Sequence, residues 1–388
     1  MSAVVQGAAA NLPQVHDEAW YAARASRGVQ GLKAYDPGHD LVGLRRRFGA
    51  AQLVELGSNE NPYGPSPAAR AAVLDRLHEL HRYPDPLGAD LKRALAHLHG
   101  VSEGELLLGN GSHELLMMVA QVFAGPGEEV VYPRYGFAVF ALATQAAGAK
   151  ACVADALPRT AAMPAGHDLD ALLAAITPAT AVLYLANPNN PTGTWLDAHV
   201  LRAFLARVPE HVIVVIDEAY AELADAPEYR SGLAMRDAHP NLVVSRTFSK
   251  AYGLAGMRVG YFVAPAGLVA VMERVRESFN VNLPALAACE AALGDVEHLE
   301  WVRARNREER AALSEALQAR GLRVFPSQTN FLLVEFGERT AAVEHALVQR
   351  GVVLRPMGGY GLGDCLRITV GTRDENRRLL LALDEVLA

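Results

Sequence analysis

The feature that most constrains the fold is an alternation of short apolar runs with helical segments through the middle of the chain. The apolar runs, rich in β-branched residues, are Glu129–Tyr132, Ala181–Ala186, Val212–Ile216, Leu242–Val244 and Tyr261–Val263. Helical patterns between them cover Glu114–Phe123, Phe137–Ala146, Asp168–Ala175 and Ala198–Arg207. Strands that are apolar throughout and separated by helices are typical of a sheet buried on both faces. We therefore predict an α/β fold with a mainly parallel sheet and helices on each side.

The pattern changes after about residue 283. A long charged helix is predicted from Val296 to Arg320, and short apolar runs follow at Phe331–Val334, Val352–Leu354 and Leu366–Val370. Short strands mixed with helices are typical of a small α+β unit. We therefore expect two lobes, which is usual for a chain of 388 residues.

Charge and composition exclude several classes of function. The formal charge is −7 and the pI is near 6.0, whereas nucleic-acid-binding domains have basic patches or a pI above about 9. No run approaches the ~20 apolar residues of a membrane helix, and the N-terminus shows no signal-peptide pattern. Three cysteines far apart favour free thiols in a reducing compartment. Four histidines lie close together, at 78, 81, 97 and 99, but they lack zinc-motif spacing. We therefore expect a cytoplasmic protein with no nucleic-acid, membrane or metal partner.

One lysine stands in a loop suited to a phosphorylated ligand. The segment Ser245–Arg258 follows the apolar run at 242–244, and in it Lys250 is flanked by small hydroxylated residues and glycines. Such residues let a phosphate approach the backbone, and Arg258 adds a fixed positive charge. Because nearby cations lower the basicity of an amine, Lys250 is suited to form a Schiff base.

Further polar segments follow neighbouring strands. Asp217 comes directly after Val212–Ile216, and the loop Asn187–Gly193 follows Ala181–Ala186. Open α/β sheets bind ligands at the carboxyl ends of their strands. At that position Asp217 could act as a buried carboxylate that keeps a pyridine nitrogen protonated. The alternative role for Asp217 is the N-cap of the next helix. The loop Leu108–Leu115 precedes a helix, where free N–H groups bind anions.

Together these segments resemble the fold-type I pyridoxal-5′-phosphate (PLP) enzymes, and more closely the histidinol-phosphate aminotransferase family. The resemblance runs from about residue 50 to the C-terminus and is carried by Ser58–Pro67, Arg82–Asp85, Asn187–Gly193, Arg246–Gly256, Phe279–Asn282, Pro326–Phe331 and Leu366–Gly371. It implies a large PLP-binding domain over residues 66–284 with a seven-stranded sheet. Residues 1–65 are then an N-terminal segment that forms part of the small domain, and residues 285–388 are the C-terminal small domain.

The resemblance implies a role for each candidate residue. Lys250 holds the cofactor and moves the proton, and Asp217 pairs with the pyridine nitrogen. The other cofactor contacts are Tyr220 and Asn190 at the ring oxygen, Tyr135 on the ring face, and Gly111, Ser112, Ser249 and Arg258 at the phosphate. Tyr83 is expected to reach the phosphate of the neighbouring subunit, which makes a homodimer with shared sites the active unit. Arg355 and Arg367 are expected at the anionic end of the substrate, and Tyr63 and Asn59 also bind it. The family usually has an aspartate where this chain has His113.

The implied reaction converts L-histidinol phosphate and 2-oxoglutarate into imidazole acetol phosphate and L-glutamate, in histidine biosynthesis. Two alternatives stay open. One is an aminotransferase for aromatic or other amino acids, since two arginines clamp a phosphate or a carboxylate equally well. The other is a PLP decarboxylase such as threonine-phosphate decarboxylase, because sequence motifs do not show which Cα bond breaks. A nicotinamide dehydrogenase is excluded because the G-x-G-x-x-G motif is incomplete.

Overall fold

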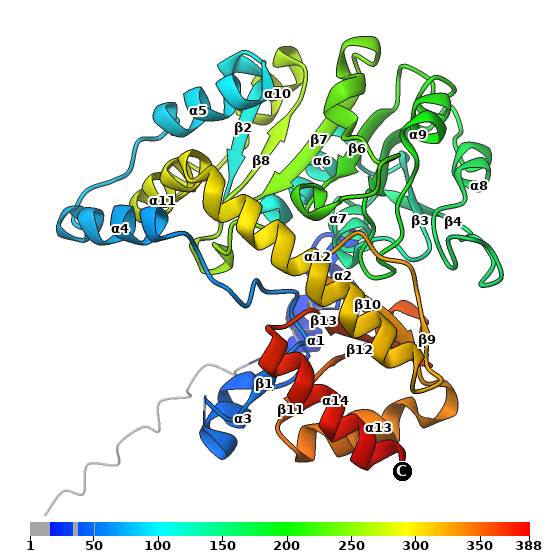
Figure 1. The fold of residues 1–388 in the computed structure, drawn as a ribbon. Helices are drawn as coiled ribbons and strands as arrows, with labels where there is room; N and C mark the ends of the chain where they lie inside the picture. Colours follow the sequence, from blue (N-terminus) through cyan, green and yellow to red (C-terminus); the bar gives the residue numbers. More distant parts are fainter. Residues whose placement is uncertain (1–15, 34–37, 50) are drawn as a thin grey trace, which may run out of the picture.

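A seven-stranded sheet forms the centre of the protein in a computed structural model that describes residues 16–33, 38–49 and 51–388 (Figure 1). In spatial order its strands are β2 (Leu106–Gly109), β8 (Gly260–Val263), β7 (Leu242–Thr247), β6 (Ile213–Asp217), β5 (Thr180–Ala186), β3 (Glu129–Pro133) and β4 (Lys150–Ala154). Strand β8 runs antiparallel to its neighbours β2 and β7, and the other pairs are parallel. The predicted mainly parallel, seven-stranded sheet is confirmed.

Helices cover both faces of this sheet because its strands are apolar on both faces. In β5, Val182 and Tyr184 pack in one core cluster, and Leu183 and Leu185 pack in another on the opposite face. The first face is covered by α6 (Ser112–Phe123), α7 (Ala138–Ala146) and α10 (Ala266–Met272). The other is covered by α8 (Leu169–Ala174) and α9 (Ala198–Leu205), with α4 (Pro67–Arg76), α5 (Ala89–His99) and α11 (Leu283–Gly294) over its β2–β8 end.

Two strands of the sheet were not predicted. Strand β4 forms one edge of the sheet and is largely exposed, so it lacks the continuous apolar pattern of the buried strands. Strand β2 is fully buried, but it has four residues and runs directly into the loop before α6. The edge position therefore hid β4 from a pattern search, and β2 was missed because its end overlaps the loop predicted at Leu108–Leu115.

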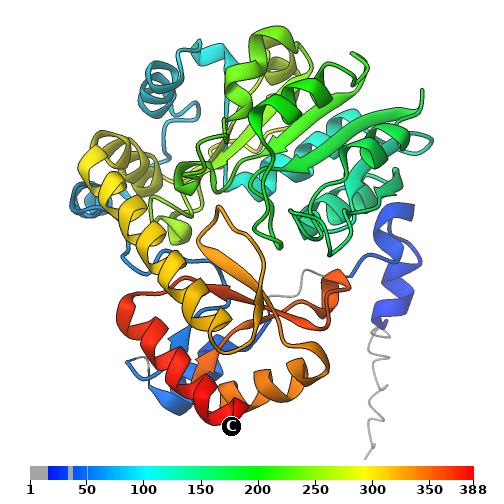
Figure 2. The same ribbon diagram turned by 45° about the vertical axis from the view of Figure 1, so that its right-hand side comes forward.

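A smaller lobe carries two further sheets (Figure 2). The antiparallel one has the order β12 (Arg355–Pro356), β13 (Cys365–Thr369), β10 (Phe331–Glu335) and β9 (Arg323–Val324). The other pairs β1 (Val54–Glu55) with β11 (Val352–Val353) in parallel. One core cluster joins these strands to α12 (Val296–Gln318), α13 (Thr340–Gln349) and α14 (Arg373–Leu387). The small α+β lobe is confirmed, whereas the predicted domain limits stay a prediction.

Within the N-terminal residues that the structure describes, the helices are α1 (Glu18–Ala22), α2 (Arg27–Gln30) and α3 (Leu41–Phe48). Helix α2 packs against α7 of the large lobe, whereas α3 lies with the small lobe in Figure 1. Within the described residues, no helix is long and apolar enough to cross a membrane.

The register of the three central strands brings the predicted site together. Ala186 of β5 lies opposite Asp217 of β6, which lies opposite Ser245 of β7. The loops that follow these strands therefore leave the sheet at the same edge. This edge faces the small lobe, and the residues of both lobes meet there.

Candidate active site

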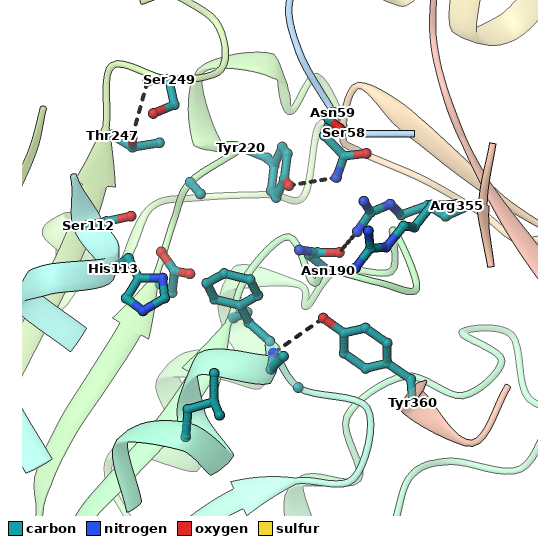
Figure 3. Close-up of a pocket in the computed structure, with 18 of the residues that line it drawn as sticks. Ser58, Asn59, Ser112, His113, Asn190, Tyr220, Thr247, Ser249, Arg355 and Tyr360 are labelled. Carbon is teal, nitrogen blue, oxygen red and sulfur yellow. Dashed lines mark hydrogen bonds between the residues drawn. The ribbon is translucent and has the colours of Figure 1, made fainter. Parts of the chain in front are cut away.

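A cavity of about 790 Å³ lies between the carboxyl edge of the sheet and the small lobe (Figure 3). Both lobes and the loop after β1 contribute to its walls. The structure brings together there most of the predicted site residues: Asn59, Ser112, Asn190, Asp217, Tyr220, Ser249, Lys250, Arg258, Arg355 and Arg367. Within the described residues, no three His, Cys, Asp or Glu side chains gather as metal ligands.

Asp217 presents to this cavity a carboxylate with one unsatisfied oxygen. The residue is 4% exposed, and its Oδ1 atom is buried without a hydrogen-bond partner. Burial raises the pKa of Asp217 to about 7. Because buried polar atoms in native structures almost always have a partner, an orphaned acceptor in a cavity indicates a ligand that supplies a donor.

Lys250 lies in the same cavity, close to the loop after β1. Its Nζ atom donates a hydrogen bond to the backbone carbonyl of Asn59 at 3.0 Å. Burial, and after it the charge of Arg367, lower the pKa of Lys250 to about 8. A substantial fraction of the amine is thus neutral near physiological pH, as a nucleophile or base requires.

Tyr220 and Asn190 belong to two hydrogen-bonded pairs that join the lobes. The Tyr220 hydroxyl accepts a hydrogen bond from Asn59 Nδ2 at 2.9 Å, and burial raises the pKa of this phenol. Asn190 Oδ1 accepts from Arg367 Nη1 at 2.6 Å. A neutral phenol and an amide NH₂ are donors suited to a ring oxygen.

The start of α6 and the loop after β7 form an anion-binding corner. Gly111 precedes the helix with φ +85°, and a Cβ there would come within 2.5 Å of Arg258 Nη2. Arg258 Nη1 in turn donates to Ser249 Oγ at 3.4 Å. Backbone N–H groups, hydroxyls and a guanidinium therefore converge near Ser112, a combination that binds phosphate. Burial and the charge of Arg258 lower the pKa of His113, so this imidazole is neutral at neutral pH.

Arg355 and Arg367 enter the cavity from the small lobe. They are directly opposite each other in the antiparallel pair β12–β13, so both side chains leave the same face of the sheet. Two like charges placed opposite each other destabilise a sheet. Their convergence on one cavity therefore indicates an anionic ligand.

Tyr135 lies outside the cavity lining, and its predicted contact with the cofactor ring stays a prediction. Tyr135 packs in a cluster with Ala165 and Leu333 and does not line the cavity, whereas Phe137 does. Tyr135 and Phe137 lie on either side of Gly136, in a tight turn after β3 in which Gly136 N donates to the carbonyl of Pro133 at 2.8 Å.

Tyr83 and Tyr63 also lie away from the cavity of this chain. Tyr83 is 81% exposed and stacks on Phe279, with ring centroids 4.6 Å apart. Tyr63 is half-buried and meets Trp301 edge to face at 4.9 Å. Neither ring is among the described side chains that line the cavity.

The lining also includes residues that were not predicted, among them Phe137, Tyr360 and Lys33. Tyr360 lies in the glycine-rich segment 358–363, and its hydroxyl accepts a hydrogen bond from Ala138 N at 3.3 Å (Figure 3). The glycines around Tyr360 are a sequence signal for a loop of this kind. Lys33 comes from the N-terminal part of the chain, where the sequence gives no comparable signal.

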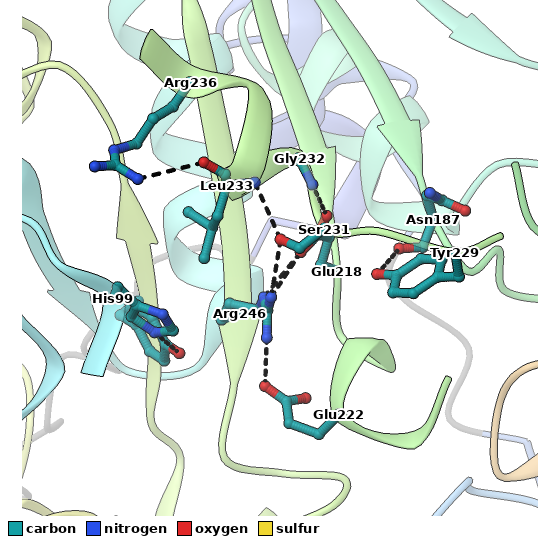
Figure 4. Close-up of polar contacts among 11 residues, drawn as sticks. His99, Asn187, Glu218, Glu222, Tyr229, Ser231, Gly232, Leu233, Arg236 and Arg246 are labelled. Atoms are coloured by element: carbon teal, nitrogen blue, oxygen red, sulfur yellow. Dashed lines mark hydrogen bonds and ion pairs between the residues drawn. The ribbon is translucent and has the colours of Figure 1, made fainter. Parts of the chain in front are cut away.

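A buried ion pair behind the cavity fixes the strands that carry the site (Figure 4). Arg246 Nε donates to Glu218 Oε2 at 2.9 Å, and Arg246 Nη1 donates to Glu222 Oε1 at 2.7 Å. Glu218 also accepts from Ser231 Oγ and from Gly232 N, each at 2.6 Å. Because Glu218 follows Asp217 directly, these contacts hold the end of β6 in place.

Comparison with known proteins places the chain in a family. Residues 51–383 match the model for aminotransferases of class I and II. Histidinol-phosphate aminotransferase 1 of Nitrosococcus oceani is 47% identical over 363 residues, which are 94% of this chain and 96% of the relative. Histidinol-phosphate aminotransferase 2 of Pseudomonas aeruginosa is 46% identical over 370 residues, 95% of this chain and 99% of the relative.

A solved structure agrees with these relatives. The histidinol-phosphate aminotransferase of Sinorhizobium meliloti in complex with PLP superimposes with a TM-score of 0.84 at 31% identity, covering 94% of this chain and 97% of the relative. The chain therefore belongs to the class I and II aminotransferases, and among them to the histidinol-phosphate aminotransferase family. It is a PLP-dependent enzyme, as the sequence predicted.

The residues of the cavity fit this cofactor. The orphaned Asp217 oxygen suits a protonated ring nitrogen, Lys250 offers an amine, and the corner around Arg258 suits a phosphate. These three groups correspond in kind to the ring nitrogen, the aldehyde and the phosphate of PLP.

Replacing Asp217 by Asn should stabilise the cofactor-free protein in a pH-dependent way. The folded pKa of about 7 lies above the ordinary value of 3.8, so wild-type stability falls as pH rises between these values. The gain in the variant should grow from about pH 4, reach on the order of a few kcal/mol, and level off above about pH 7. Chemical denaturation of the two cofactor-free proteins at pH 5 and pH 8 measures the difference in their free energy of unfolding. The same difference at both pH values would contradict the raised pKa of Asp217.

Proposed function

We propose that the protein transfers the amino group of L-histidinol phosphate to 2-oxoglutarate, forming imidazole acetol phosphate and L-glutamate in histidine biosynthesis. The observation that carries the proposal is the 46–47% identity, over nearly the whole chain, to relatives of that name. The paired arginines at the small-lobe side of the cavity support it, because a phosphate monoester needs such a partner.

When bound, PLP withdraws electrons from the amino substrate and makes its Cα hydrogen acidic. Asp217 supports this by holding a proton on the ring nitrogen through its buried negative charge. Lys250 Nζ, once free as a neutral amine, takes the proton from Cα, and its lowered pKa suits it as a base. Tyr220 and Asn190 would orient the ring from the side of its oxygen, and the stacking role of Tyr135 stays a prediction.

Arginine side chains orient the cofactor at one end of the cavity and the substrate at the other. Arg258, with Ser249 and the first N–H groups of α6, holds the cofactor phosphate. Arg355 and Arg367 bind the anionic end of the substrate, either a phosphate or the carboxylate of the 2-oxo acid. Asn59 positions both Tyr220 and Lys250 and thereby borders the substrate.

A homodimer is proposed from an exposed apolar surface around α4. Large apolar side chains there are 37–81% exposed: Leu74, Leu77, Leu80, Tyr83, Leu87, Val275 and Phe279. We call these side chains the α4 patch; helix α4 lies at the left of Figure 1. Exposed apolar side chains that gather in this way mark interaction sites. A second copy on this patch would bury Tyr83, in keeping with its predicted contact to the neighbouring cofactor phosphate. The cytoplasmic location and the domain limits at residues 65 and 284 stay predictions.

The choice of amino donor is tested by a single half-reaction. Purified enzyme with PLP is mixed separately with L-histidinol phosphate, phenylalanine, tyrosine, glutamate and threonine phosphate, and the cofactor absorbance is followed. We expect rapid conversion to the amine form with L-histidinol phosphate and with glutamate. Lys250→Ala should lose both the conversion and the absorbance of lysine-bound cofactor.

Other outcomes of this experiment would replace the proposal. Conversion by an aromatic amino acid, with none by L-histidinol phosphate, would keep the transamination but change its substrate. Release of CO₂ from threonine phosphate would change the type of reaction. Wild-type turnover by Lys250→Ala would remove this lysine from its role.

The dimer is tested with a charge on the α4 patch. Leu80 is 61% exposed, so Leu80→Glu should leave the fold of the single chain intact but place a charge in the interface. Sedimentation should show a dimer for the wild type and a shift to monomer for the variant, with loss of activity. Val200→Glu, at a 46% exposed position on α9 outside the patch, is the matched control. A fully active wild-type monomer would refute the proposal.

A further inference from the structure

The described N-terminal residues reach the substrate side of the cavity at two places. Lys33 lines the cavity. Gly38 lies against the guanidinium of Arg355, which lines the same cavity from the small lobe. The N-terminal part of the chain is therefore in contact with the end of the site assigned above to the anion of the substrate.

The contact at Gly38 leaves no room for a side chain. Gly38 has φ +88°, and a Cβ on it would lie 2.0 Å from Arg355 Nη1 and 3.0 Å from Arg355 Cζ. Carbon and nitrogen atoms do not approach so closely without a bond. Any other residue at this position would therefore displace either the guanidinium or the backbone that borders it.

The backbone next to Gly38 is tied to the lobe that carries Arg355. The His39 imidazole lies 2.7 Å from a carboxylate oxygen of Glu344 on α13. The following residue, Asp40, caps α3 by accepting a hydrogen bond from Gly43 N at 3.0 Å. These residues place the segment after Gly38 next to the small lobe, and a Cβ at Gly38 would meet the guanidinium of Arg355 directly.

We propose that Gly38 is a positioning residue for substrate specificity: its missing side chain lets the Arg355 guanidinium sit where it binds the phosphate of the amino donor. The inference rests on the proposed function, since it acts through the role of Arg355. It predicts that bulk at Gly38 weakens recognition of the phosphate and leaves the chemistry at Lys250 unchanged.

The test compares two donors that differ in the phosphate alone. Gly38→Ala enzyme with PLP is mixed with L-histidinol phosphate and, separately, with L-histidinol. We expect the half-saturating concentration of L-histidinol phosphate to rise roughly tenfold or more, as for a lost charge-assisted hydrogen bond. The maximal rate and the half-saturating concentration of L-histidinol should stay as in the wild type.

Two further variants separate this effect from backbone strain. Gly49 has φ +80° and nothing within 4 Å of a Cβ, so Gly49→Ala introduces comparable strain without the contact. Gly38→Asn introduces the Cβ with a residue that tolerates positive φ, and keeps the test valid if Gly38→Ala folds poorly. We expect both Gly38 variants to lose the preference for L-histidinol phosphate over L-histidinol, and Gly49→Ala to keep it. Equal behaviour of the Gly38 and Gly49 variants would overturn the inference.

Arg355→Ala distinguishes failure of the inference from failure of the function. If Gly38 acts through Arg355, then Gly38→Ala should add nothing to the effect of Arg355→Ala in the double variant. A phosphate-specific defect in Arg355→Ala with none in Gly38→Ala would refute the inference and keep the role of Arg355. If Arg355→Ala preferred L-histidinol phosphate over L-histidinol as strongly as the wild type does, both the role of Arg355 and the inference for Gly38 would be overturned. A wild-type enzyme that does not convert L-histidinol phosphate at all would refute the proposed function itself.

Discussion

The unpaired carboxylate of Asp217 is the group on which the rest of the site depends. Its burial is unfavourable by on the order of a few kcal/mol, as the raised pKa of about 7 indicates. The sheet keeps the carboxylate there, because Asp217 is paired in register between Ala186 and Ser245. The buried pair of Glu218 and Arg246 fixes the same strands from behind. The fold thus holds a buried carboxylate in place to accept a hydrogen bond from a protonated ring nitrogen.

The site is complete only where the two lobes meet. Lys250 of the large lobe donates to the carbonyl of Asn59, and Asn190 accepts from Arg367 of the small lobe. Arg367 also lowers the pKa of Lys250 through its charge. An anion that binds Arg367 would offset this effect and make the amine more basic. In the proposed mechanism, substrate binding at Arg367 and the basicity of Lys250 are therefore coupled.

Much of the fold and of the cofactor end of the site could be predicted from the sequence. Asp217 ends the apolar strand β6 and the loop that holds Asn190 begins directly after β5, so one pattern marked both the strands and their functional ends. The presence of Phe137 in the cavity wall depends on the turn after β3, which spacing does not encode. The pairing of Arg355 with Arg367 depends on strand register, and the approach of Gly38 depends on tertiary packing.

The most direct test of this account is the protonation state of the ring nitrogen of bound PLP. Enzyme loaded with PLP labelled with ¹⁵N in the ring is compared by NMR between the wild type and Asp217→Asn at pH 8. We predict the chemical shift of a protonated nitrogen in the wild type and of an unprotonated one in the variant, because the buried negative charge of Asp217 holds that proton. An unprotonated nitrogen in the wild type, or identical shifts in the two proteins, would contradict the account.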